Sequence, residues 1–161
     1  MQVAVSDTGP INYLVLIGHI DLLPFLFKKT YLPVAVDQEL KAEKAPIQVR
    51  KWIAHPPVWL EVCESPTYLR DDPTLHLLDR GEGDAIELAK VLDVNLLLMD
   101  DRDGVKAALS RGLAVTGTIG ILDLAAKQGL LNLADAFARL RQTTFHCPNA
   151  LMTKLLLEQK R

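Results

Sequence analysis

Residues 95–102 read Asn-Leu-Leu-Leu-Met-Asp-Asp-Arg, and this stretch says most about the fold of the chain. The apolar run at 96–99 is typical of a short strand covered on both faces, as in a parallel sheet. Asp100 and Asp101 follow the run directly, and two adjacent charges at the mouth of a buried strand are costly. The stretch therefore predicts an interior strand that brings two acids to one edge of a sheet.

On both sides of this stretch, short apolar segments alternate with helical ones. Strands are predicted at 3–6, 31–32, 58–62, 96–99 and 113–115, and a polar loop at 65–74. Helices are predicted to start at Pro10 and to cover 20–27, 33–43, 47–53, 84–93, 104–111, 119–128, 132–141 and 148–159, with Thr118 as the cap of 119–128. This alternation predicts an α/β protein of three layers, α/β/α, in which the central layer is a mostly parallel sheet.

The length of 161 residues and the hydrophobic content of 49% predict a single domain, 1–161, with a well-filled core. Helices from about residue 131 are expected to pack on it or extend from it. No apolar run approaches the roughly 18 residues that cross a bilayer, so no membrane association is expected. A signal segment is not recognisable, and Cys63 and Cys147 form no disulfide or zinc pattern. The expected location is cytoplasmic.

The formal net charge of −2 does not by itself indicate a nucleic-acid-binding protein. Five acids are candidates for a metal site, and setting their five charges aside changes the net charge from −2 to +3. The rest of the surface is then mildly basic, which permits contacts with phosphates without predicting them.

These five acids are expected to gather at one edge of the sheet. Asp7 follows the first predicted strand and Asp100-Asp101 follow another, and ligands of such sheets collect at the carboxyl ends of the strands. Asp84 is expected at the start of the helix that leads into the strand at 96–99, just after a turn that contains Glu82. Glu39 belongs to the helix after the second strand and reaches the same edge if that helix starts near it.

Crowded carboxylates repel one another and take up protons unless a cation compensates their charge. Oxygen ligands suit Mg²⁺ or Mn²⁺, whereas the four histidines show no paired spacing that would indicate zinc. Each acid taken alone has an ordinary structural explanation as a turn residue, a helix cap or a solvated side chain. The prediction of a metal site rests on the combined pattern.

Five motifs together resemble PIN domains. They are Ser6-Asp7-Thr8-Gly9-Pro10, Val36-x-x-Glu39-Leu40, Gly81-Glu82-Gly83-Asp84-Ala85, Leu97-Leu98-Met99-Asp100-Asp101-Arg102 and Gly117-Thr118-Ile119-Gly120-Ile121-Leu122. The order and spacing of the motifs are similar to those of a prokaryotic subgroup of uncharacterised relatives of the VapC toxin ribonucleases. The resemblance covers roughly residues 3–130.

This resemblance implies specific site residues. The catalytic residues would be Asp7, Glu39, Asp84 and Asp101; the metal ligands Asp7, Asp84, Asp100 and Asp101; and the substrate-binding residues Thr8 and Arg102. Many PIN domains have a Thr or Ser two positions before the last acid, where this chain has Met99. Whether Asp100 or Asp101 faces the metal is therefore left open.

The resemblance further implies a Mg²⁺- or Mn²⁺-dependent ribonuclease that hydrolyses RNA phosphodiester bonds. It also implies a toxin role in a toxin–antitoxin pair, a small antitoxin protein as partner, and a homodimer. Ile121, Leu122 and Leu124, or the apolar face of the last helix, are candidate antitoxin contacts, with a role in the core as the alternative.

Three other functions were weighed against this one. A phosphotransferase of the haloacid-dehalogenase type would have a second Asp two residues after Asp7, where this chain has Gly9. A response-regulator receiver would place its acidic pair elsewhere than on the strand at 96–99. A catalytically inactive regulatory or RNA-binding module with the same fold stays open, because acids suited to a metal are necessary for turnover and not sufficient.

Overall fold

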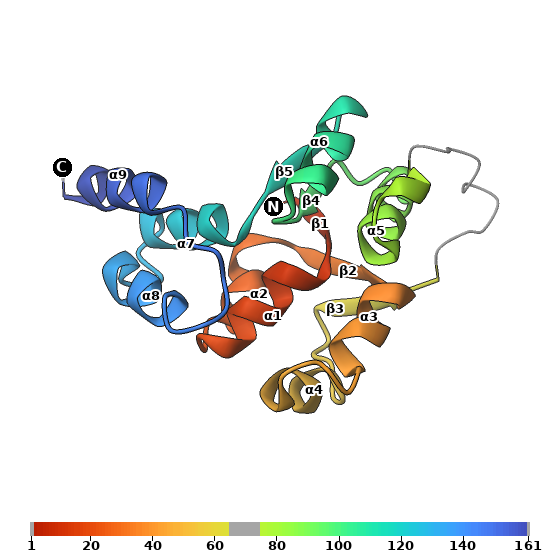
Figure 1. The fold of residues 1–161 in the computed structure, drawn as a ribbon, viewed down its shortest axis with the longest axis horizontal. Coiled ribbons are helices and arrows are strands. Elements are labelled where there is room, and N and C mark those ends of the chain that lie inside the picture. Colours follow the sequence, from red (N-terminus) through yellow and green to blue (C-terminus); the bar gives the residue numbers. More distant parts are fainter. Residues whose placement is uncertain (1, 65–74, 161) are drawn as a thin grey trace.

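The computed structural model describes residues 2–64 and 75–160 (Figure 1). Five strands of this part form one sheet in the order β3-β2-β1-β4-β5, and all four neighbouring pairs are parallel. The strands are β1 (Val3–Ser6), β2 (Lys29–Pro33), β3 (Leu60–Cys63), β4 (Leu96–Leu98) and β5 (Ala114–Thr116). The predicted parallel α/β class is confirmed, and the loop predicted at 65–74 lies outside the described residues.

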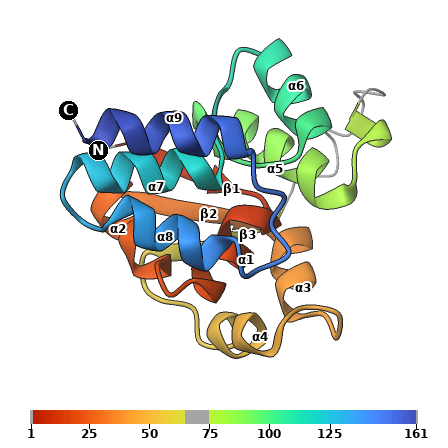
Figure 2. The same ribbon diagram turned by 60° about the vertical axis from the view of Figure 1, so that its left-hand side comes forward.

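Helices cover both faces of the sheet (Figures 1 and 2). They are α1 (Thr8–Leu16), η1 (Ile20–Leu22), α2 (Leu23–Leu26), α3 (Val34–Lys41), α4 (Ile47–Ile53), η3 (Leu75–Leu77), α5 (Arg80–Val91), α6 (Arg102–Ser110), α7 (Thr118–Lys127), α8 (Leu133–Leu140) and α9 (Asn149–Gln159). The predicted three layers are therefore present.

Alternation along the strands divides the core into two clusters. Ala4 and Leu98 pack on the side of α1, α2, α4 and α7, whereas Val5 and Leu97 pack on the side of α5 and α6. Successive side chains of a strand point to opposite faces, so β1, β2, β3 and β4 each contribute to both clusters. β1 and β4 are adjacent at the centre of the sheet, and their carboxyl ends lie side by side.

Two helix starts differ from the prediction because aspartates cap them earlier than expected. Asp79 accepts a hydrogen bond from the backbone N–H of Gly81 (3.0 Å), so α5 begins at Arg80 and not at residue 84. Asp101 accepts bonds from Asp103 and Gly104, so α6 begins at Arg102 and not at 104. The segment expected to be a turn before Asp84 is thus the first turn of α5.

The start of α7 and the role of its apolar residues also differ from some of the expectations. Gly117, not Thr118, occupies the cap position, and the Thr118 hydroxyl bonds elsewhere. Ile121 and Leu122 are fully buried in the core, so these two candidate antitoxin contacts are unavailable to a partner. α8 and α9 lie beside α7 (Figure 2), and Met152 of α9 is fully buried.

Within the described residues, no single helix has the length and apolar character to cross a membrane. The helix pair Thr8–Leu16 and Ile20–Leu26 is bent by 115°, and together the two helices have the length and composition of a membrane span, by these two criteria alone.

The adjacent central strands predict where the fold is most sensitive to a cavity. Leu98→Ala removes a fully buried side chain and should lower the free energy of unfolding by about 2–5 kcal/mol in urea denaturation. Leu109→Ala, at a position 56% exposed on α6, should change it by about 0.5 kcal/mol or less. Equal losses in the two variants would contradict this assignment of the core.

Candidate active site

The sheet brings the acids after β1 and β4 together. The backbone N–H of Asp7 donates to the carbonyl of Leu98 (2.9 Å), which continues the β1–β4 pairing by one step beyond Ser6. The Met99 N–H donates to the carbonyl of Thr116 (3.1 Å), so β4 is still tied to β5 just before Asp100. Asp7 and the Asp100-Asp101 pair consequently share the carboxyl edge of the sheet, as the sequence predicted.

Asp7 is the most deeply placed acid of this edge. Its residue is only 7% exposed, and burial raises the pKa of its carboxyl group to about 7. A backbone hydrogen bond from Thr8 opposes this shift, whereas the negative charges of Asp79, Glu39 and Asp100 add to it. A carboxyl group with three acids acting on it is a strong candidate for binding a cation.

Glu39 reaches the same edge from α3. The Thr8 hydroxyl donates a hydrogen bond to Oε2 of Glu39 and so ties α1 to α3. The first turn of α5 approaches both acids, because a Cβ on Gly81 would lie 3.0 Å from Oε2 of Glu39 and 3.3 Å from Oδ1 of Asp7. The lack of a side chain at Gly81 lets these carboxylates lie against the start of α5.

Asp100 is held in place by the start of α7. The Thr118 backbone N–H donates to its Oδ1 (2.7 Å) and the Thr118 hydroxyl to its Oδ2 (2.6 Å). Burial raises the pKa of Asp100, and these two bonds oppose the rise. A Cβ on Gly117 would lie 2.7 Å from Oδ1, so this carboxylate is closely packed as well as bonded.

The other member of the pair, Asp101, contacts Glu82, an acid for which the sequence predicted no role. Glu82 in the first turn of α5 is 7% exposed, and its carboxyl group forms a hydrogen bond with that of Asp101. Burial raises the pKa of Glu82 to about 8, and Asp101, Asp7 and Asp79 add to the rise. Two carboxyl groups can bond only if one carries a proton, and the raised pKa places it on Glu82.

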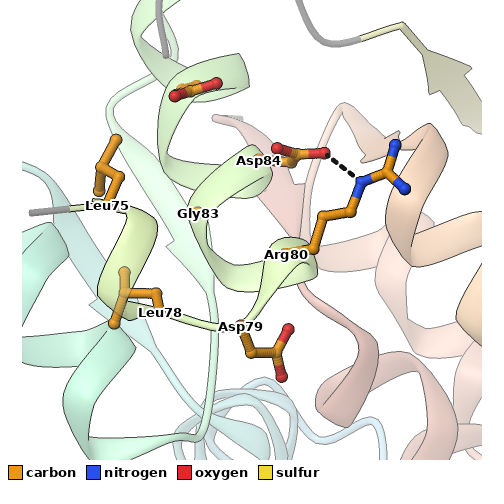
Figure 3. Close-up of a pocket in the computed structure, with 7 residues that line it drawn as sticks. Leu75, Leu78, Asp79, Arg80, Gly83 and Asp84 are labelled. Atoms are coloured by element: carbon orange, nitrogen blue, oxygen red, sulfur yellow. Dashed lines mark ion pairs between the residues drawn. The ribbon is translucent and has the colours of Figure 1, made fainter. Parts of the chain in front are cut away.

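Asp84 lies on the same helix, and its place among these acids stays a prediction. Glu82 and Asp84 are two positions apart on α5, so their side chains project about 200° apart around the helix. Asp84 forms an ion pair with Arg80 (3.8 Å, Figure 3) and lines a hollow of about 180 Å³ with Leu75 and Glu87. Glu82 is the acid of α5 whose carboxyl group contacts Asp101.

The two predicted substrate contacts occupy different positions. Thr8 bonds to Glu39, which gives it a role in fixing an acid, and its contact with substrate stays a prediction. Arg102 is exposed at the first position of α6 and lines an open hollow of about 640 Å³ with Asp100 and Asp101. Its side chain is therefore available to a ligand that reaches the acids.

The donor set suits a hard divalent cation, because it consists of carboxylate oxygens that are buried or crowded together. As placed, however, no three His, Cys, Asp or Glu side chains among residues 2–64 and 75–160 have the spacing of a ready metal site. Glu82 and Asp101 bond to each other, and Asp100 is engaged by Thr118. Binding of a cation would require the proton on Glu82 to leave.

A family model for the PIN domain matches residues 3–161. The chain belongs to the PIN-domain family. The match extends past the motifs recognised at 3–130 and includes α8 and α9. PIN domains are generally nucleases and typically use divalent metals, so the family fits the acid-rich edge. A search of curated proteins finds no match.

The raised pKa values of this PIN domain predict a pH-dependent stability. Asp7 binds a proton more tightly in the folded state, so its contribution is present below about pH 4 and lost as pH rises to about 7. In metal-free buffer, Asp7→Asn should therefore melt several degrees above wild type at pH 8, with a smaller difference at pH 5. Thermal unfolding with a chelator measures this.

The exposed residue Asp21 provides the control for this experiment. Asp21→Asn should leave the melting temperature close to that of wild type at both pH values. The same advantage of Asp7→Asn at pH 5 and pH 8 would contradict a raised pKa at this position.

Proposed function

We propose that this PIN-domain protein is a Mg²⁺- or Mn²⁺-dependent ribonuclease that hydrolyses phosphodiester bonds of RNA. The observation that carries the proposal is the convergence of five acids on the carboxyl edge of the sheet. They are Asp7, Glu39, Glu82, Asp100 and Asp101. Burial, and to a smaller extent three neighbouring acids, raise the pKa of Asp7, and a bound divalent cation would stabilise its charged form.

Each acid is assigned a role by its position. Asp7, Glu82, Asp100 and Asp101 would hold the metal, with Glu82 in the place predicted for Asp84. A divalent ion held there would supply positive charge for the phosphate oxygens and would lower the pKa of a water molecule. Glu39 is exposed and fixed by Thr8, so it is placed to orient the attacking water and accept its proton.

Arg102 contributes from the rim of the site. Its guanidinium is always charged and matches the geometry of a phosphate group. At the first position of α6, next to Asp101, it can contact the phosphate that is attacked or the next one along the strand. The positive charge of Arg102 would offset the negative charge of the phosphate beside an otherwise acidic edge.

An inactive module that binds RNA without cleaving it is the second candidate. The spacing of the carboxylates favours this candidate, because no three His, Cys, Asp or Glu side chains of the described residues lie close enough together to hold a metal ion. The toxin role, an antitoxin partner, a homodimer and a cytoplasmic location are further proposals, and the first three rest on the resemblance to VapC relatives.

The test of the proposed function is cleavage of a mixed RNA pool in Mn²⁺. Wild-type protein should cleave the RNA. Asp7→Asn should cleave at least about 100-fold more slowly, because it lacks the buried carboxylate that would bind the ion. A chelator should abolish the cleavage. RNA binding without cleavage by folded wild-type protein in Mn²⁺ would favour the inactive module.

A second pair of variants separates the two acids of α5. Glu82→Gln should reduce the cleavage rate by about 100-fold or more, whereas Asp84→Asn should cost about 10-fold or less. Both changes keep the side-chain size and lie on the same helix, so each is the control for the other. A larger loss for Asp84→Asn would restore the assignment made from the sequence.

A further inference from the structure

The hollow beside Asp100 and Asp101 has a lining of two chemical kinds. Asp100, Asp101 and Arg102 are charged lining residues, and Tyr13, Phe145 and Leu151 form an aromatic and apolar part of the lining, called here the aromatic wall. Its volume of about 640 Å³ and its opening to solvent make it a groove and not an enclosed cavity. A ligand lying across it would place a charged group at the acids and an apolar, flat group against the aromatic wall.

The aromatic wall is held firmly. The rings of Tyr13 and Phe145 meet edge to face, with centroids 5.0 Å apart and planes at 75°. The hydroxyl groups of Tyr13 and Thr144 are hydrogen-bonded at 3.0 Å, which ties α1 to the segment before α9. The Phe145 N–H donates to the Thr143 hydroxyl (3.1 Å). A wall ordered before binding lowers the entropic cost of capturing a ligand.

The two hollows that border the carboxylate cluster are not equivalent. The smaller one, of about 180 Å³, is lined by Asp79, Asp84 and Glu87 together with Arg80 (Figure 3), so it presents mainly negative charge to a nucleic acid. The larger groove offers Arg102, His146 and the aromatic wall. Of these two hollows, the larger groove is therefore the more favourable path for a strand whose phosphate lies at the acids.

We propose that this groove is a nucleobase-binding site, in which Phe145 and Tyr13 receive the base of the nucleotide next to the attacked phosphate of a single-stranded RNA. The inference rests on the proposed function, because the position of the phosphate comes from it. A base in a duplex is stacked on its neighbours and cannot reach the wall, so the site selects unpaired RNA.

The experiment measures binding apart from cleavage. Fluorescence anisotropy in Ca²⁺ compares a single-stranded RNA of about ten nucleotides with an abasic ribose-phosphate strand of the same length, whose integrity is checked on gels. Wild-type protein should bind the RNA more tightly than the abasic strand. Phe145→Leu keeps an apolar side chain but loses the flat ring, and should weaken RNA binding by about 10-fold while leaving the abasic strand unchanged.

Matched controls come from residues outside the groove. Phe25 on α2 is 64% exposed, and Phe25→Leu should change neither affinity. Leu151 lines the groove, whereas Leu157 lies on the same helix and is 59% exposed. Leu151→Glu should weaken RNA binding and Leu157→Glu should not. This pair decides the matter if Phe145→Leu lowers the melting temperature, since Phe145 also packs against the core.

The outcomes separate the two proposals. If wild-type protein prefers the base-bearing strand, Phe145→Leu or Leu151→Glu weakens RNA binding, and no RNA is cleaved in Mn²⁺, the ribonuclease proposal fails and the base site stands. If it cleaves RNA while Phe145→Leu and Leu151→Glu bind RNA as wild type does, the base site is overturned and the ribonuclease stands. Equal affinity for RNA and the abasic strand also overturns the base site.

Discussion

Electrostatic repulsion between acids at the carboxyl edge of the sheet is the constraint around which this structure is arranged. β1 and β4 lie side by side, so Asp7 and Asp100 are brought together by the same backbone pairing that forms the sheet. Burial strengthens their repulsion, because a low dielectric screens the charges less. It also disfavours the ionised form of each carboxyl group. The fold tolerates the acids by protonation, by hydrogen bonds from neighbouring hydroxyl and amide groups, or by a cation.

Two threonines and two glycines determine how the acids are arranged. Thr8 bonds to Glu39 and Thr118 bonds to Asp100, so each carboxylate is fixed by a neighbouring helix start. Gly81 and Gly117 leave room for the acids, since a Cβ at either position would lie within 3.0 Å of a carboxylate oxygen. Hydrogen bonds orient the acids and glycines allow close approach. Neither device neutralises the charge, which leaves that task to protons or metal.

The sequence revealed those parts of the site that follow from topology. Asp7 and the Asp100-Asp101 pair follow apolar strands directly, and parallel strands must align their carboxyl ends. The choice between Glu82 and Asp84 depends instead on where α5 begins, and the cap Asp79 moves that start by four residues. Asp79 followed three residues later by Glu82 resembles a capping pattern, which was the available signal. In that helix the side chains of Glu82 and Asp84 project about 200° apart.

Other features needed the folded chain. Thr118 is a suitable helix cap by residue type, yet its hydroxyl bonds to Asp100, a partner that only the sheet brings near. The acids at Asp7 and Glu82 also oppose folding above neutral pH, since their raised pKa values mean that ionisation costs stability. Amides at these positions would relieve that cost. Acids that weaken their own fold are explained most simply by a use for their charge, as sites of function often show.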